Sequence, residues 1–413
     1  MQRDKQRRGV LDLLRVRDLG IVYALILLVV VLTIVSAATG RPNYLGGDNV
    51  ANILDQASLV GILAVFMTVV LVSGNFDLSV GSIGALAAAI SLSVIDERGV
   101  VVAVLLAIGA AAAAGLVNGL IVQVLGINAF IVTLGTMTAL RGVVLILTDG
   151  RTITAESSDA RTALQSIESG FWTVNVPVIL GVLALLAAGA AFAAGHRGRR
   201  LAVLGGGGAI LAIAGFAGDM GFRYAKPVWY MAAITLMTWA VLRFTVVGRR
   251  LYATGANMEA ARLSGINVAR YKVVPFVLTG AAAGVVGVLY GAKLGATNPT
   301  ALNGLELTVI AAAILGGTSL FGGSGSVITS VVGALFLFTI ANGFNVLNLG
   351  ANYQDLIEGV VLIVAAGVYT VASRRKARAG SAPEPPEDGA STPAGPAATS
   401  TATPPARAEA LHG

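Results

Sequence analysis

The sequence predicts an all-α fold, a polytopic transmembrane helix bundle of about 10–12 spans with an internal repeat. Of its 413 residues, 56% are hydrophobic and only 12% are charged, whereas a soluble domain has about 25% charged residues. In lipid, the backbone can satisfy its polar groups only in helices or in a closed barrel. The apolar runs are about twenty residues long and do not alternate with polar residues, which favours helices.

Twelve segments are long and apolar enough to be candidate spans. The stretches 57–95 and 305–346 contain glycine-rich breaks, so broken or re-entrant helices are the alternative to simple spans there. The first run ends in a faint resemblance to a signal-peptide cleavage site, but its length favours an uncleaved span. The candidate spans are approximately residues 19–38, 57–74, 77–95, 100–124, 127–147, 174–195, 201–221, 228–246, 272–293, 305–320, 325–346 and 353–373.

The placement of positive charge predicts the topology, because the cytoplasmic loops of membrane proteins are rich in Lys and Arg. With the N-terminal segment 1–18 inside, an alternating path also places the basic clusters at 196–200, 249–270 and 374–378 in the cytoplasm. The net charge of +7 is thereby assigned to membrane topology and not to nucleic-acid binding. We expect a multi-pass protein of the bacterial cytoplasmic membrane with both termini in the cytoplasm.

The domain organisation follows from the same pattern. Residues 19–373 form the predicted transmembrane domain, with a cytoplasmic loop at 248–275. Residues 379–413 are rich in Pro, Ala, Ser and Thr, which predicts a disordered cytoplasmic tail. The polar segment 149–171 falls on the outer side of the membrane and has a size suited to contacting an external partner.

The cytoplasmic loop carries the sequence Glu-Ala-Ala-Arg-Leu-Ser-Gly between Glu259 and Gly265. The Glu-Ala-Ala run favours a short helix with a small-residue face, and the glycine ends or kinks it. We interpret it as a docking helix for a soluble motor subunit, with a surface amphipathic helix as the alternative. The candidate docking residues are Gly255, Asn257, Glu259, Ala260, Ala261, Arg262, Gly265 and Ile266.

Residue types that support catalysis are scarce. The chain has no Cys and only two His, so neither a metal site nor a nucleophilic triad is predicted. It also lacks the glycine-rich loop ending in Gly-Lys-Ser/Thr that binds nucleotide phosphates. No enzymatic activity, metal or cofactor is predicted for this chain, and ATP hydrolysis is assigned to a separate partner.

Two polar, glycine-rich breaks, Ser73–Ser82 and Gly316–Ser326, interrupt apolar runs. Discontinuous helices of this kind border the substrate path in transporters, although a tight turn between packed spans is the alternative. The ionisable residues Asp77 and Arg141 are also candidates for the path, and the alternative for them is a position at a helix end near the membrane interface. The candidate path residues are Asn75, Asp77, Ser79, Ser82, Asn118, Arg141, Thr318, Ser319 and Asn342.

An internal repeat relates two parts of the chain at a constant offset. Asn118-Gly119, Leu125-Gly126 and Gly135 correspond to Asn342-Gly343, Leu349-Gly350 and Gly359. Repeated halves are typical of transporters, with the substrate path at their interface. The sequence leaves open whether the repeat is parallel or inverted.

Several motifs resemble the permease subunits of bacterial ABC sugar importers of the ribose, xylose, arabinose and galactoside group. They cover about 50–150 and 248–373, while 174–246 matches less well and adds apolar spans, as in the longer xylose-type permeases. The motifs are Ser-Gly-Asn-Phe-Asp-Leu-Ser-Val-Gly-Ser, Val-Asn-Gly-Leu-Ile-Val, Phe-Ile-Val-Thr-Leu-Gly-Thr-Met-Thr-Ala-Leu-Arg-Gly, Thr-Asp-Gly-Arg-Thr-Ile, Gly-Ala-Asn-Met-Glu-Ala-Ala-Arg-Leu-Ser-Gly-Ile-Asn-Val and Ala-Ala-Ile-Leu-Gly-Gly-Thr-Ser-Leu-Phe-Gly-Gly-Ser-Gly.

The resemblance implies a set of partners and a cargo. Two permease subunits, expected to be a homodimer, would form one path through the bilayer for a monosaccharide, expected to be a pentose such as xylose. ATP-binding subunits would dock around 259–265, and an extracytoplasmic sugar-binding protein would dock on the outer face. The alternatives are a related permease for branched-chain amino acids or nucleosides, and an ion-coupled secondary transporter that acts alone.

Overall fold

The computed structural model describes residues 20–175 and 222–348, a few isolated residues between 178 and 210, and residues 359 and 360. The chain divides into one unit at Met1–Tyr369 and another at Thr370–Gly413, and every described residue belongs to the first. The predicted N-terminal segment, the tail at 379–413 and nearly all of the predicted spans 174–195, 201–221 and 353–373 lie outside the described residues.

Helices make up most of the described part of the first unit, and the strands are short. The helices are α2 (Gly20–Ala38), α3 (Gly47–Val72), α4 (Val80–Val124), α5 (Ala129–Leu147), α6 (Ser158–Glu168), α9 (Lys226–Phe244), α10 (Val246–Ala256), α11 (Met258–Leu263), α12 (Val268–Leu294), α13 (Leu305–Leu315) and α14 (Val327–Leu347). The strands are β1 (Ile153–Thr154), β2 (Phe171–Val174), β3 (Phe222–Ala225) and β4 (Ala296–Thr297).

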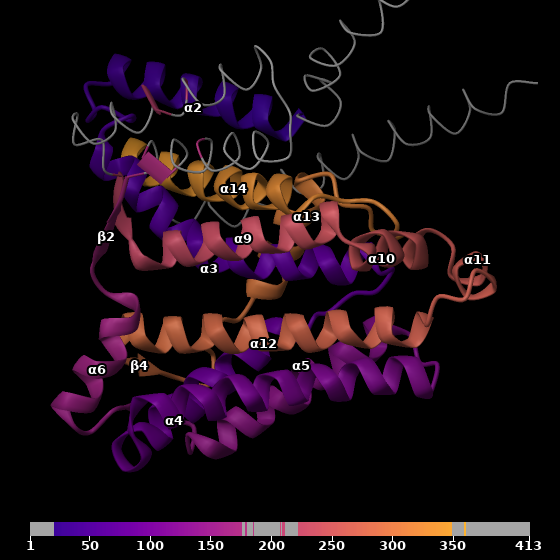
Figure 1. Cartoon of the computed structure of the whole chain (residues 1–413). Helices are drawn as coiled ribbons and strands as arrows, with labels where there is room; N and C mark the ends of the chain where they lie inside the picture. The colour runs from indigo at the N-terminus through magenta and orange to yellow at the C-terminus, as the bar shows by residue number, and fades with distance from the viewer. Residues whose placement is uncertain are drawn as a thin grey trace, which may run out of the picture. The chain divides into compact units, whose positions relative to one another are not determined.

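Seven of the helices in the described ranges are long and apolar enough to cross a membrane, and they confirm the predicted polytopic helix bundle. α4 covers residues 80–95 of the predicted span 77–95 and all of the span 100–124, and Gly99, with φ of 74°, breaks its helical geometry between them. The long helices lie side by side, with α12 between α9 and α5 in this view (Figure 1).

Two predicted spans are wrong in their extent. The span expected at 305–320 is α13, whose 11 residues measure about 16 Å at 1.5 Å per residue, too short for a hydrocarbon core of about 30 Å. The chain is broken here, as the alternative for 305–346 anticipated. α3 begins at Gly47, ten residues before the predicted span at 57, because its first turns are polar and lower the local hydropathy.

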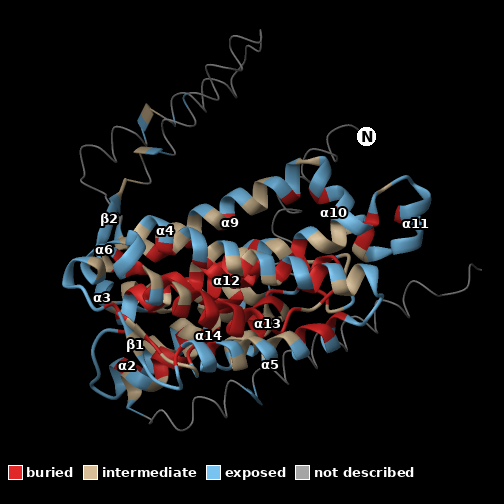
Figure 2. Cartoon of the chain, turned by 90° about the horizontal axis from the view of Figure 1, so that it is seen from below, coloured by how far each residue is buried: buried red, intermediate tan, exposed pale blue. Residues whose placement is uncertain are grey.

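The core lies around α3, the first half of α4, and α12 (Figure 2). Glycines let α12 approach α4 backbone to backbone, since a Cβ at Gly287 would overlap the carbonyl oxygen of Gly84, and one at Gly115 would overlap that of Phe276. Close packing through small residues is the usual way in which helices associate in lipid. In contrast, α2 and α5 are mostly exposed within this single chain.

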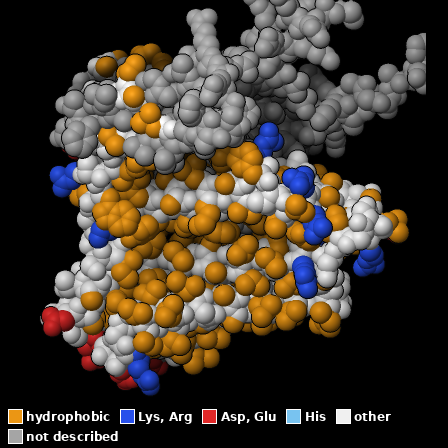
Figure 3. All heavy atoms as spheres, viewed as in Figure 1, with side chains coloured by type: hydrophobic (Ala, Val, Ile, Leu, Met, Phe, Trp, Pro, Cys, Tyr) orange, Lys and Arg blue, Asp and Glu red, His pale blue; other side chains and the backbone are white. Residues whose placement is uncertain are grey.

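The two ends of the bundle differ. α10 and α11 lie at one end of α12, and α6 lies at the other, where Gly295 meets side-chain atoms of Arg161 and Gln165 (Figure 1). Two antiparallel strand pairs are present among the described residues, β1 with β4 and β2 with β3. Figure 3 shows an apolar face between the end that bears Lys and Arg side chains at α10 and α11 and the end where Asp and Glu gather near α6.

The repeated asparagines lie on helices that run in opposite directions. The second half of α4 is antiparallel to α12, because Gly119 packs on Val273 and Gly115 on Phe276. α14 runs antiparallel to α3, because Asn49 bonds Asn342 and Thr68 bonds Ser330, and α12 does the same, so α14 also runs against the second half of α4. This is the orientation that an inverted repeat requires. The repeat itself stays a prediction, since its second copy extends beyond residue 348.

Candidate functional site

Four of the predicted path residues or their neighbours form one buried polar chain beside the first glycine-rich break. Asp77 follows α3, and its Oδ1 accepts hydrogen bonds from the backbone nitrogen (2.9 Å) and the hydroxyl (2.5 Å) of Ser79. Asn118 Nδ2 donates to Ser79 Oγ at 2.9 Å, and Thr136 Oγ1 donates to Asn118 Oδ1 at 2.6 Å. This side-chain network therefore joins the first glycine-rich break to the second half of α4 and to α5.

Two buried side-chain oxygen atoms near this break have no hydrogen-bond partner among the described residues. They are Asp77 Oδ2 and Ser82 Oγ, and both residues are completely buried. Asn75, also buried, donates to Ser73 Oγ at 3.1 Å and so closes its own turn. A buried polar atom without a partner costs free energy of folding, and water or a polar solute that reached this carboxylate oxygen would remove that cost.

The second glycine-rich break, between α13 and α14, contacts the first one through its backbone. Gly323 donates its backbone N–H to the carbonyl oxygen of Val72 at 2.9 Å. Its polar side chains point elsewhere. Thr318 Oγ1 lies 3.3 Å from Ser330 Oγ on α14, and the backbone nitrogen of Ser319 donates to the carbonyl oxygen of Ser324 in the same loop at 3.0 Å.

The remaining two path predictions lie apart from both breaks. Asn342 Nδ2 donates to Asn49 Oδ1 at 2.9 Å, which joins α14 to the start of α3. Arg141 on α5 donates through Nη1 to the carbonyl oxygens of Pro299 and Ala301, at 3.0 and 2.7 Å. The structure thus brings Asp77, Ser79 and Asn118 into one network and distributes the other predicted residues over the bundle.

Arg141 borders a cavity of about 360 Å³ near the α6 end of the bundle. Thr138, Thr300, Asn303 and Glu306 supply its other polar side chains, and Glu306 Oε2 has no partner among the described residues. Hydroxyl, amide and carboxylate groups around a small cavity suit a polyhydroxylated ligand. Sequence reasoning did not select Thr136 or Asn303, because a lone Thr or Asn in or beside an apolar run forms no pattern.

The predicted docking segment is a separate short helix, as expected. α11 has six residues, and Asn257 caps it by accepting from the backbone nitrogen of Ala260 at 2.9 Å. Ile266 N donates to Ala261 O at 3.1 Å, and Gly265 adopts a φ of 76°, a left-handed conformation that glycine enters without strain. Ala261 is buried, while Glu259, Ala260 and Arg262 are exposed and free for a partner.

The loop predicted at 248–275 is largely helical, and its end lies earlier than expected. α10 and α11 occupy most of it, and α12 begins at Val268 and continues through Pro275. A proline inside a membrane helix is tolerated where neighbouring helices cover the freed carbonyl, and Pro275 is buried.

Gly255 places the end of α10 directly on the two breaks. A Cβ at this position would overlap the carbonyl oxygen of Val72 and come close to the backbone nitrogen of Gly323. One turn earlier, the hydroxyl of Tyr252 donates to Gly325 O at 2.8 Å. Burial raises the pKa of Tyr252, an effect that Arg243 opposes, so the phenol keeps its proton for this bond. The segment that carries α11 is therefore attached to both breaks.

The polar segment predicted at 149–171 folds into a cap on the opposite end of the bundle. Asp96 accepts from the backbone nitrogens of Glu156 and Ser157 at 2.8 and 3.0 Å, just before α6. Lys293 at the end of α12 pairs with Asp55 at 2.6 Å and with Glu168 at 3.6 Å. Burial is the main cause that raises the pKa of Glu168, and Lys293 opposes it.

Comparison with known proteins identifies the family. Residues 49–366 match the family model described as "Branched-chain amino acid transport system / permease component". The ribose import permease protein RbsC of Escherichia coli (strain K12) is 36% identical over 343 residues, 83% of this chain and 91% of the relative. The xylose transport system permease protein XylH of the same organism is 33% identical over 371 residues, 86% of this chain and 93% of the relative.

The ribose import permease protein RbsC of Bacillus subtilis (strain 168) is 32% identical over 352 residues, 84% of this chain and 91% of the relative. No solved structure matches the chain. The family match covers most of the chain, including both breaks, α11 and the Arg141 cavity, and the membrane-spanning helices agree with a multi-pass protein of the inner membrane. The chain therefore belongs to the permease family of bacterial ABC sugar importers that includes the ribose and xylose permeases, as a non-catalytic transport subunit.

Proposed function

We propose that this chain forms the membrane path of an ABC importer that carries a pentose into the cytoplasm. The observation that carries the proposal is the attachment of the exposed helix α11, through Gly255 and Tyr252, to the junction of the two breaks. A soluble subunit that moves α11 on ATP binding or hydrolysis would move the backbone of both breaks together. Because packed backbones do not deform gradually, such a contact transmits a displacement.

The docking surface comprises the exposed part of α11 and its flanks. Glu259 and Arg262 offer opposite charges one turn apart, and Ala260 offers a small surface that a cleft can enclose. Two ATP-binding subunits would bind two such helices, one from each permease subunit. The second permease subunit is a further copy of this chain, because closed symmetric dimers are the commonest assemblies.

The path runs between two polar regions. At the outer end, Arg141, Asn303 and Glu306 border the 360 Å³ cavity, where they would exchange hydrogen bonds with sugar hydroxyls. At the other end, the Asp77 network and the two breaks form the part that α11 controls. Asn75, Ser82, Thr318, Ser319 and Asn342 would shape and support the helices around this path.

Orientation and outer partner follow from the charge pattern. The α10–α11 end lies in the cytoplasm with both termini, since basic loops stay inside. The cap of β1, α6 and β4 then faces outward and would receive an extracytoplasmic sugar-binding protein. The ribose and xylose permeases at 36% and 33% identity favour a pentose cargo, and the name of the matched family leaves branched-chain amino acids as the second candidate.

Uptake by proteoliposomes that contain the permease, its ATP-binding subunits and the sugar-binding protein tests the proposal. Labelled ribose, xylose and leucine are compared, with ATP inside the vesicles and with the ATP-binding subunits left out. We expect ATP-dependent uptake of a pentose alone. Uptake that persists without the ATP-binding subunits would identify an ion-coupled transporter, and uptake of leucine alone would assign the chain to amino acids.

A charge reversal tests the docking surface separately. Glu259→Arg should abolish co-purification of the ATP-binding subunits while the variant still enters the membrane. Glu156→Arg is the matched control, because it makes the same change on an exposed residue of the outer cap. Co-purification of the ATP-binding subunits with Glu259→Arg at the level of the control would contradict the assignment of α11.

A further inference from the structure

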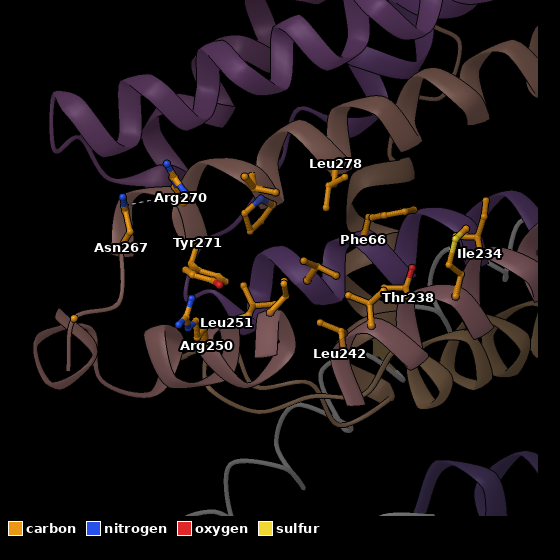
Figure 4. Close-up of a pocket in the computed structure, with 17 residues that line it drawn as sticks. Phe66, Ile234, Thr238, Leu242, Arg250, Leu251, Asn267, Arg270, Tyr271 and Leu278 are labelled. Atoms are coloured by element: carbon orange, nitrogen blue, oxygen red, sulfur yellow. Dashed lines mark hydrogen bonds between the residues drawn. The ribbon is translucent and has the colours of Figure 1, made fainter. Parts of the chain in front are cut away.

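An apolar groove with a positively charged mouth lies between α9, α10 and α12, behind α11. Its cavity measures about 600 Å³, within the range of small-molecule sites. Phe66 and Val69 on α3 also line it. Arg250 and Arg270 both lie toward one end, with Tyr271 between them in this view (Figure 4). Gly265 and Asn267, which join α11 to α12, also border that end.

The polar and apolar groups of the groove are separated along its length. From the two arginines, the lining continues on α12 through Val274 to Leu278 and on α9 through Val241 to Ile234 (Figure 4). Eight residues of α12 between Arg270 and Leu278 correspond to about 12 Å at 1.5 Å per residue. One leaflet contributes about half of the roughly 30 Å hydrocarbon core, so the groove follows most of a leaflet's depth.

Both arginines are available to a ligand. No acidic residue lines the groove, and no ion pair joins Arg250 or Arg270 to a carboxylate within the part of the chain that the structure describes. Arginine binds phosphate through two parallel hydrogen bonds. Basic pockets between membrane helices on the cytoplasmic side are suited to anionic lipid headgroups.

The mostly apolar lining along α9 and α12 matches an acyl chain as the occupant. Val241, Val274 and Leu278 are each about 40–50% exposed, so a lipid can enter sideways from the bilayer.

We propose that this groove binds one anionic phospholipid, with its phosphate at the end that bears Arg250 and Arg270 and one acyl chain along α9 and α12. The occupied groove supports the joint between α11 and α12 from behind, because Gly265 and Asn267 line its charged end. The site is separate from the sugar path and binds lipid whatever sugar the permease carries.

Lipid retention by the intact transporter tests the proposal. The full chain with its ATP-binding subunits is placed in nanodiscs of phosphatidylcholine with a minor fraction of phosphatidylglycerol, then released into mild detergent and analysed by native mass spectrometry. We expect one tightly held phosphatidylglycerol per permease chain. The double variant Arg250→Gln/Arg270→Gln should lower that retention at least about tenfold, the equivalent of the 1.5–3 kcal/mol ascribed to charged hydrogen bonds.

The matched control is Arg243→Gln/Arg249→Gln. It removes the same charge from the same region, but these two arginines border a neighbouring cavity beside Tyr252 and not the groove. The control should retain phosphatidylglycerol as the wild type does. Equal retention by both double variants, or equal retention of phosphatidylcholine by the wild type, would overturn the proposal.

A second variant keeps the arginines and fills the groove. Val241→Trp should displace phosphatidylglycerol without changing the charge, and inorganic phosphate at millimolar concentration should not displace it. Release by phosphate would assign the arginines to a free anion instead. A protein occupant of the groove can be detected with the variant Met237→Cys. Because the chain has no native Cys, any disulfide it forms must involve this residue. A Met237→Cys disulfide between two chains in native membranes would show that a second copy covers this groove.

Discussion

The backbone nitrogen of Gly323 donates a hydrogen bond to the carbonyl oxygen of Val72 across 2.9 Å, and so joins two segments that are far apart in the sequence. Val72 is the last residue of α3, and Gly323 lies in the loop before α14. Since a helix leaves its last carbonyl groups without intrahelical partners, the glycine-rich loop supplies a partner that the break of α3 requires. Gly255 packs on the same two residues.

Gly255→Ala should uncouple transport from ATP hydrolysis. The added Cβ would overlap the carbonyl oxygen of Val72, and backbone must shift, which typically costs about 1–3 kcal/mol. We expect sugar uptake per ATP hydrolysed to fall at least about tenfold, corresponding to 1.4 kcal/mol within that range. Gly135→Ala is the control, because a Cβ there meets no atom within 4 Å. Unchanged coupling in Gly255→Ala would show that this contact transmits nothing.

Tyr252→Phe removes the hydroxyl that donates to Gly325 O. The carbonyl is left without that partner, so the free energy of unfolding should fall by about 1–2 kcal/mol, seen as a lower melting temperature of the purified transporter. Tyr290→Phe is a suitable control, since no hydrogen bond is found for its hydroxyl in the described structure. Equal melting temperatures of the two variants would mean that the Tyr252 bond contributes no stability.

Hydropathy and local pattern were sufficient to predict the helix bundle and a short helix near 259–265. Asp77 and Asn118 were selected separately, and the fold alone shows that Ser79 joins them. The start of α3 was missed because Asp48, Asn49, Asn52 and Asp55 lower the hydropathy of its first turns. Their partners, such as Lys293 for Asp55 and Asn342 for Asn49, come from distant parts of the chain. A local pattern contains no information about those pairings.

Arg141 shows a second limit on predicting the site from the sequence. Its type and position in an apolar run identified it as unusual, because a charge in lipid is costly. The groups that satisfy it are the backbone carbonyls of Pro299 and Ala301, and any residue carries a carbonyl. Sequence therefore selects the residue that needs partners, but the fold alone reveals which partners it has and which cavity it borders.

Asn118→Ala and Thr136→Val should show strong energetic coupling. Each single variant breaks the 2.6 Å hydrogen bond between these side chains and leaves a buried group without its partner, which costs about 1–3 kcal/mol. The double variant should lose less than the sum, because a pair in direct contact usually shows a coupling of about 0.5–3 kcal/mol. Thermal unfolding of the wild type and the three variants gives the free energies of unfolding for this double-mutant cycle. Additive losses would mean that the network acts as independent contacts.

The raised pKa of Glu168 should make the cap around α6 sensitive to pH. Burial raises its pKa in the folded protein above the ordinary value of 4.5, so the folded state binds its proton more tightly than the unfolded state. Where the unfolded state has lost the proton and the folded state keeps it, stability falls as pH rises. The contribution of Glu168 to the free energy of unfolding is therefore fully present below pH 4.5 and is lost as the pH rises through its raised pKa in the folded protein.

Glu168→Gln removes this titration while keeping a similar shape. We expect hydrogen exchange of the α6 amides, corrected for the intrinsic pH dependence of exchange, to show a cap that loosens above pH 4.5 in the wild type and stays constant in the variant. Glu156→Gln is the control, since that side chain is exposed and should leave the wild-type pH dependence unchanged. A cap that tightens with rising pH in the wild type would show that pairing with Lys293 outweighs burial, which would reverse the sign of the pKa shift.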